Sequence, residues 1–134
     1  TALINQVRDE IFELRTNSSK GLKQQLDDQI SVLLTGSDID YEVVGDVEIE
    51  SYKRFELIRA VREIVINARR HSGCSQIALN LSDEKIVITD NGSGGVTEKS
   101  NSFGLTGVQE RLTQIGALLS SESNSTGTKM IIKF

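Results

Sequence analysis

Four polar residues lie close together in the sequence at spacings that fit one helix. Glu63 and Asn67 are four residues apart, so they project from one face of a helix, and Arg70 and His71 follow within the next turn. A carboxylate can order or deprotonate a hydroxyl, imidazole or water, an amide oxygen is a hard ligand suited to Mg²⁺, and a nearby cation can bind phosphate oxygens. The same residue types are also usual on a solvated helix face, so the spacing alone leaves both interpretations open.

Three glycine-containing segments provide a second group of candidates. Asp90-Asn91-Gly92-Ser93-Gly94-Gly95 directly follows an apolar stretch, where glycines let the backbone approach a ligand and the carboxylate can accept a hydrogen bond from an exocyclic amine. Gly104-Leu105-Thr106-Gly107 precedes a helical pattern, and the free amides of a helix start favour an anion such as phosphate. Gly127-Thr128 precedes the last strand pattern. A polar turn, a hinge with an N-cap and a simple turn are the respective structural alternatives.

Apolar periodicity predicts the helices that carry these residues. The first covers about residues 2–15, and the second follows a cap offered by Asn17-Ser18-Ser19 and ends near Gly36. A long central helix lies between Ser51 and Ser72, and a short one is closed by Gly116. The apolar stripes of the first, second and last helices are Leu3, Val7, Ile11 and Leu14; Leu22, Leu26, Ile30 and Leu33; and Val108, Leu112 and Ile115.

Alternation of apolar and polar residues predicts strands between the helices. The alternating segments are Ile39–Val43, a shorter one at Val47 and Ile49, Ile77–Leu81, Ile86–Ile88, and a last one through Met130, Ile132 and Phe134. Ser82-Asp83-Glu84 is a natural hairpin turn, and a polar loop extends from Asp90 to Gly107. Some strands come in hairpins and others come after helices. We therefore expect an α/β fold: a two-layer sandwich with a mixed sheet covered on one face by helices.

Composition narrows the class of protein. The 134 residues match one domain, and 37% hydrophobic with 25% charged residues is typical of a globular chain. The net charge of -4 and the pI near 5.0 disfavour nucleic acid as a partner. A single cysteine, Cys74, indicates a reducing, cytosolic setting and a small packed side chain at a helix-to-strand turn. The start at Thr1 without a signal-peptide pattern suggests an excised fragment that makes no membrane contact itself, with any anchor upstream.

The motifs in their order resemble the nucleotide-binding boxes of the GHKL, or Bergerat-fold, ATPases. Within that group they are most similar to bacterial sensor histidine kinases of the nitrate-sensor and DesK type, over about Glu56 to the C-terminus. The matching segments are Glu63-x-x-x-Asn67-x-x-Arg70-His71, Asp90-Asn91-Gly92-x-Gly94, Gly104-Leu105-x-Gly107-x-x-Glu110-Arg111-Leu112 and Gly127-Thr128. The resemblance implies the Bergerat fold, ATP and Mg²⁺ as cofactors, and two-component signalling as the setting.

The resemblance also implies roles for individual positions. Asn67 would bind Mg²⁺ that bridges the ATP phosphates, and Glu63 would be the catalytic base or would order the water of the metal. Asp90 would accept from the adenine amino group, and Thr128 would reach adenine through water. The remaining ATP-binding positions are Gly92 and Gly94 in the pocket wall, Gly104, Leu105 and Gly107 in the lid, Arg70 at the phosphates, and His71, which either lies beside the nucleotide or merely caps the helix.

By the same resemblance, residues 1–16 are the C-terminal end of a dimerisation helix and residues 17–134 are the ATP-binding catalytic domain. The γ-phosphate would go to a histidine on that helix, upstream of Thr1, rather than to His71. The implied partners are the dimerisation helix of a homodimer and a response regulator. Gly95 and the short lid at 96–103 depart from the usual pattern, so weak ATP affinity is expected. A serine kinase of the anti-sigma-factor type and a degenerate, non-catalytic docking module are the alternatives.

Overall fold

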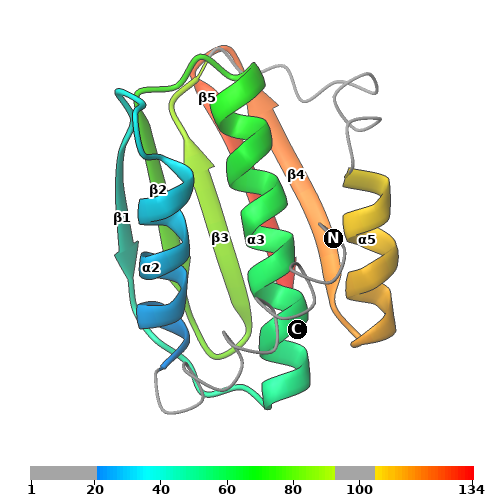
Figure 1. Ribbon diagram of the computed structural model, residues 1–134. Coiled ribbons are helices and arrows are strands. Elements are labelled where there is room, and N and C mark those ends of the chain that lie inside the picture. Colours follow the sequence, from blue (N-terminus) through cyan, green and yellow to red (C-terminus); the bar gives the residue numbers. More distant parts are fainter. Residues whose placement is uncertain (1–20, 93–104) are drawn as a thin grey trace, which may run out of the picture.

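The computed structural model describes residues 21–92 and 105–134. The predicted first helix, the cap at 17–19 and the lid at 96–103 lie outside these residues. Within them the chain forms three helices and five strands (Figure 1). In chain order they are α2 (Leu22–Leu33), β1 (Asp40–Val44), α3 (Ser51–His71), β2 (Gln76–Leu81), β3 (Lys85–Asp90), α5 (Leu105–Gln114), β4 (Leu118–Asn124) and β5 (Gly127–Lys133).

The strands form one mixed sheet in the order β1-β2-β3-β5-β4. β1 and β2 are parallel because α3 connects them as a crossover, whereas the other neighbouring strands are antiparallel. The turn between β2 and β3 is the predicted hairpin, closed by the Ser82 N–H, which donates to the Lys85 carbonyl at 3.0 Å. The predicted mixed sheet is confirmed.

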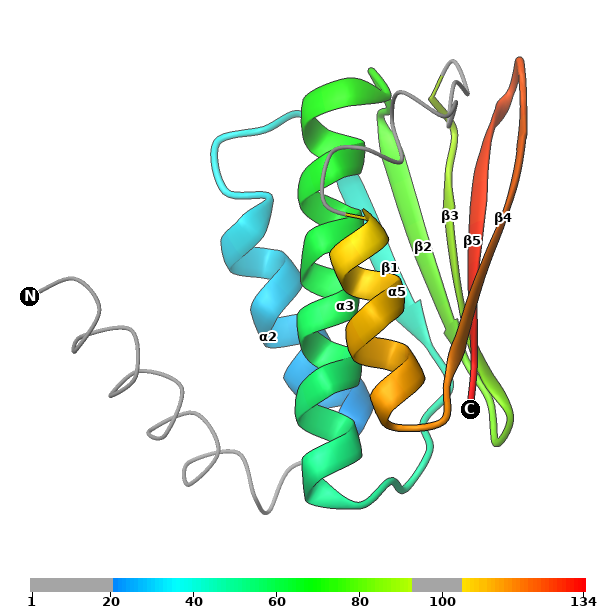
Figure 2. The same cartoon turned by 90° about the vertical axis from the view of Figure 1, so that its right-hand side faces the viewer.

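All three helices lie on one face of the sheet (Figure 2). Every second residue of the central strands points into this layer: Ile77 and Leu79 on β2 and Ile86 on β3 are fully or almost fully buried. They meet the apolar stripe of α3, which includes Val61 and Val65. The opposite face of the sheet is uncovered by any described helix, so the predicted two-layer α/β sandwich is confirmed.

Both ends of α2 are stabilised by residues far away in sequence. The N-cap is Gly21, which makes no side-chain bond, and the Lys23 N–H instead donates to Asp46 Oδ1 at 3.1 Å. At the other end, Arg69 Nη1 donates to the Leu33 carbonyl at 2.6 Å and to the Thr35 carbonyl at 3.2 Å. A cap from the loop after β1 therefore serves the start of α2.

Four predicted details need correction. The buried apolar stripe that α2 begins ends on its C-cap residue Leu34 rather than on Leu33, which is only partly buried. Val47 and Ile49 form no strand, because the chain turns at Gly45 and they pack singly against the core. β1 is shifted by one residue toward the C-terminus relative to the prediction, and α5 begins at Leu105, inside the predicted polar loop. The sequence does not locate β4, because the side chains of this strand are nearly all exposed and give no apolar alternation.

Candidate functional site

The described candidates lie on elements that meet at one end of the molecule. This end contains the C-terminal ends of α3 and β3 and the first residues of β5, and α5 begins toward the same end (Figure 1). α3 and α5 are also in direct contact. Gly94 and Gly104 lie outside the described residues, so their placement stays a prediction.

α3 presents Glu63 and Asn67 one turn apart, and both side chains are partly buried. The Nδ2 atom of Asn67 is buried and has no hydrogen-bond partner among the described residues. A buried polar atom without a partner costs free energy, so this amide is suited to a ligand that the described residues do not supply. Arg70 and His71 are exposed in the last turn of the helix.

Asn67 and Glu63 on α3 can supply one or two oxygen ligands to Mg²⁺, but not a complete set of ligands. No group of three or more His, Cys, Asp or Glu residues that could hold a metal exists within 21–92 and 105–134. Mg²⁺ is often held by one or two protein oxygens together with water and substrate phosphates, and rotation of the Asn67 amide would present such an oxygen. These residues therefore suit a metal that arrives with a nucleotide.

Asp90 ends β3 directly opposite Thr128, the second residue of β5. The Gly92 N–H donates to Asp90 Oδ1 at 2.9 Å. Burial raises the pKa of the Asp90 carboxyl, and hydrogen bonds from the backbone of Gly92 and Thr128 oppose that rise. Gly127 makes this close pairing possible, since its φ is 152° and a Cβ there would lie 2.1 Å from the Asp90 carbonyl oxygen.

The Thr128 hydroxyl has a partner that the sequence did not reveal. Thr128 is only 4% exposed, and its Oγ1 lies 3.2 Å from Ser123 Oγ on the neighbouring strand β4. Since the chain pairs Asp90 with Thr128 and Thr128 with Ser123, three polar side chains follow one row across the sheet toward the helix layer. Recognising Ser123 required the register of a hairpin whose first strand has no apolar pattern.

Gly92 joins the Asp90 loop to the end of α3. A Cβ at Gly92 would lie 2.4 Å from the carbonyl oxygen of Ser72, the residue after His71. Only glycine allows this approach of two backbone segments. The structure therefore brings Asp90, Gly92 and Thr128 together directly, and links them through Ser72 to the helix that carries Asn67.

Two hollows border these elements. The first, of about 330 Å³, lies between the start of α5 and the β4–β5 hairpin and is lined by Leu105, Gln109, Glu110, Leu119, Ser120, Ser121 and Met130. Gly107 lies in the first turn of α5 next to it.

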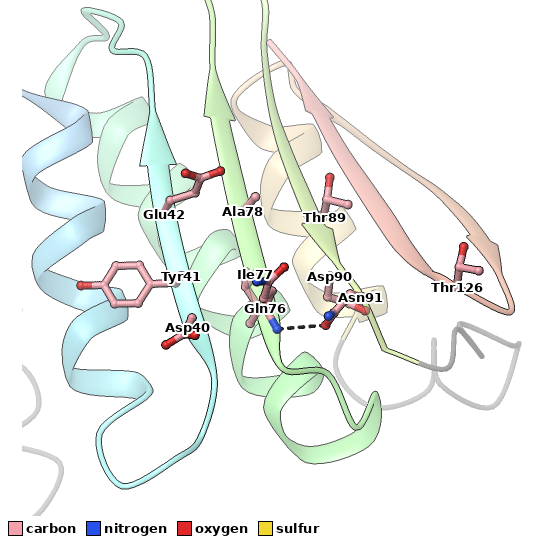
Figure 3. A pocket seen from close by; sticks show the side chains of 10 residues that line it. All are labelled: Asp40, Tyr41, Glu42, Gln76, Ile77, Ala78, Thr89, Asp90, Asn91 and Thr126. Carbon is pink, nitrogen blue, oxygen red and sulfur yellow. Dashed lines mark hydrogen bonds between the residues drawn. The ribbon is translucent and has the colours of Figure 1, made fainter.

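The second hollow, of about 420 Å³, is lined by Asp40, Tyr41, Glu42, Gln76, Ile77, Ala78, Thr89, Asp90, Asn91 and Thr126 (Figure 3). It includes neither Glu63 nor Asn67.

The sequence of the chain is similar to those of known proteins. No protein-family model matches the chain. The chain is 32% identical over 106 residues to the signal transduction histidine-protein kinase/phosphatase DegS of Brevibacillus brevis, covering 73% of this chain and 28% of DegS. It is 30% identical over 139 residues to the sensor histidine kinase LiaS of Bacillus subtilis (strain 168), covering 96% of this chain and 39% of LiaS. The chain belongs to the sensor histidine kinase family. It spans well under half the length of these relatives.

Solved histidine kinases share the fold. A blue-light activated histidine kinase of Erythrobacter litoralis superposes with a TM-score of 0.75 at 20% identity, covering 85% of this chain and 41% of that one. The ATP-binding domain of PrrB from Mycobacterium tuberculosis gives a TM-score of 0.64 at 24% identity, covering 85% of this chain and 93% of that domain. This histidine kinase segment therefore has the architecture of a kinase ATP-binding domain. Within its described residues, no helix combines the length and apolar character needed to cross a membrane.

Proposed function

We propose that this chain is the GHKL-type, ATP-binding catalytic domain of a sensor histidine kinase, which transfers the γ-phosphate of ATP to a histidine on a dimerisation helix. The observation that carries the proposal is the buried Nδ2 atom of Asn67, which has no hydrogen-bond partner among the described residues, on the helix whose end contacts the loop of Asp90. The carboxylate that we propose recognises adenine and the proposed ligand of a phosphate-bound metal therefore belong to two contacting segments.

In this proposal each end of the nucleotide has its own residues. Asp90 accepts a hydrogen bond from the adenine amino group, and Thr128 contacts adenine through water. Asn67 holds Mg²⁺, and Glu63 acts as the base or orders the water of the metal. The other proposed ATP contacts are Arg70 and His71 at the end of α3, Gly92 and Gly94 in the pocket wall, and Gly104, Leu105 and Gly107 in the lid.

Phosphoryl transfer to an imidazole requires positioning and charge stabilisation more than covalent chemistry by the protein. Mg²⁺, when bound, neutralises the charge that develops on the phosphate oxygens. The residues of the chain would orient the nucleotide, exclude water and accept the proton of the nucleophile at the Glu63 carboxylate. The acceptor histidine must then be docked beside this site.

The same proposal extends to the parts beyond the domain. Residues 1–16 are the end of the dimerisation helix and 17–134 the catalytic domain, in a bacterial homodimer that passes its phosphate to a response regulator. The domain works in the cytoplasm, and the full protein is held at the membrane if an anchor lies upstream. Neither nucleic acid nor lipid is needed as a partner of this segment.

The experiment that tests this function is incubation of the full-length protein with ATP labelled on the γ-phosphate, followed by a stability test of the phosphoprotein. Label that is lost in acid and retained in base identifies phosphohistidine and supports the proposal. Label that survives acid identifies phosphoserine and favours the anti-sigma-factor type of kinase. Failure to bind any adenine nucleotide would instead favour a docking module.

A further inference from the structure

Asn91, between Asp90 and Gly92, fastens the end of β3 to the start of β2. Its Oδ1 accepts the backbone N–H of Ser75 at 2.8 Å and that of Gln76 at 2.9 Å, and its Nδ2 donates to Ser75 Oγ at 2.9 Å. The Asn91 N–H also donates to the Gln76 carbonyl at 3.3 Å. Figure 3 draws a hydrogen bond between Asn91 and Gln76. The side chain thus uses both of its polar atoms on one turn.

That turn leads directly out of α3. Ser72 Oγ donates to the Ala68 carbonyl at 2.7 Å and accepts the Cys74 N–H at 3.2 Å, so the chain leaving the helix is braced against its last turn. Gly92 contacts the Ser72 backbone at the same place. The segment from Ser72 to Gln76 is therefore held by α3 on one side and by Asn91 on the other.

We propose that Asn91 is a positioning residue that fixes the spacing between the adenine-binding and phosphate-binding halves of the site. The inference rests on the proposed function, in which Asp90 lies at the adenine and Asn67 at the metal-bound phosphates. Asp90 precedes Asn91 in the chain, and Asn67 lies on the helix that leads into the turn which Asn91 holds. Asn91 touches the connection between the halves rather than the ligand.

The spacing affects only those ligands that contact both halves. Mg²⁺-ATP gains the full benefit of two sets of contacts only when both are held at the right separation, whereas AMP without Mg²⁺ lacks the metal-bound phosphates. Loss of the hydrogen bonds of one side chain is expected to weaken Mg²⁺-ATP binding about tenfold. The affinity for AMP should stay within about twofold, because Asp90 and Thr128 remain paired through the β3–β5 ladder.

The test is an NMR titration of the 134-residue chain with a non-hydrolysable Mg²⁺-ATP analogue and, separately, with AMP in the absence of Mg²⁺. Asn91→Ala should lose affinity for the first ligand alone. Asn91→Asp, which retains an acceptor for the two backbone amides, should recover most of the loss. Asn124→Ala is the matched control, because Asn124 also holds a turn, through its Oδ1, which accepts the Thr126 N–H at 2.8 Å, but this turn joins β4 to β5 rather than α3 to β2.

Equal weakening of both ligands would overturn the inference, since a displaced Asp90 or a loosened fold acts on both. Unchanged affinity for both would overturn it as well. Should Asn91→Ala fail to fold, Ser75→Ala removes only the Nδ2 bond and must show a smaller loss confined to Mg²⁺-ATP. If the unsubstituted chain binds neither ligand, the proposed function itself fails, which is distinguishable from selective failure of Asn91.

Discussion

The carboxylate of Asp90 is proposed to bind adenine, and its ionisation in a buried position lowers the stability of the fold. Burial raises its pKa above the ordinary value of 3.8, although two backbone amides favour the ionised form. The folded chain therefore binds the Asp90 proton more tightly than the unfolded chain does. This group favours folding at low pH, and that contribution is lost as the pH rises from 3.8 through the raised pKa of the folded state.

Replacing Asp90 by Asn should remove this titration while keeping an acceptor for the Gly92 N–H. We expect Asp90→Asn to melt at a higher temperature than the unsubstituted chain at pH 7, with a difference that shrinks toward zero near pH 4. Adenine nucleotide binding should be lost at the same time. Melting curves at several pH values check this; a difference that does not change with pH would contradict the assignment of the cost to ionisation.

Single residues were predictable from the sequence where the chemistry and the local spacing coincide. The placement of Glu63 and Asn67 on a helix and of Asp90 at a strand end is predicted correctly, because helical and strand patterns fix these positions, whereas their roles stay predictions. The role of Ser123 and the contacts of Asn91 are not predictable from the sequence, because both depend on which strands are neighbours and in which register they pair. Their partners are close in space and carry no pattern of their own.

At the scale of the element, α5 contains a glycine that its fold does not require. Gly107 lies in the first turn, and among the described residues the nearest atom to a Cβ there is Arg111 Nη1 at 3.8 Å. Gly107→Ala should therefore raise the free energy of unfolding by about 0.5 to 1 kcal/mol through helix propensity.

The same substitution should weaken nucleotide binding if the backbone of Gly107 closes over phosphates. Urea unfolding and nucleotide titration of the same sample give the two values. A variant that is more stable and binds ATP normally would remove Gly107 from the proposed site. A higher free energy of unfolding together with weaker nucleotide binding would show that Gly107 serves the ligand rather than the fold.

The start of α2 depends on a cap from the loop after β1. Asp46 Oδ1 accepts the Lys23 N–H at 3.1 Å and the Val47 N–H at 2.8 Å. Asp46→Ala should lower the free energy of unfolding by about 1 kcal/mol, and Asp46→Asn, which keeps a capping oxygen, should lower it by clearly less. Equal losses for both variants would show that the charge, rather than the cap, matters.

Elements with strong apolar periodicity are predicted well from the sequence. Elements whose side chains mostly face solvent, or which lack a strand to pair with, are not. α3 was bounded correctly because its apolar stripe runs without glycine or proline from Ser51 to His71. β4 lies at the edge of the sheet, where most side chains face solvent and any polar residue is tolerated. Val47 and Ile49 alternate like a strand, yet they pair with none of the described strands.

At the scale of the whole molecule, the layer arrangement followed from the sequence but the strand order did not. Hairpins and a helical crossover imply a mixed sheet with helices on one face. The insertion of β5 between β3 and β4 is a pairing of distant segments that local patterns leave undetermined. This insertion is what places Thr128 opposite Asp90, so the site depends on the part of the fold that was hardest to predict.

Binding of ATP by this domain through Asn67 and Mg²⁺ is tested most directly by calorimetric titration. The chain and its Asn67→Ala variant are titrated with a non-hydrolysable ATP analogue and with ADP, each with and without Mg²⁺. We predict saturable one-site binding that Mg²⁺ strengthens, and loss of the Mg²⁺-dependent part in Asn67→Ala. Absence of binding at millimolar nucleotide, or an unchanged affinity in the variant, would contradict ATP binding through Asn67 and Mg²⁺.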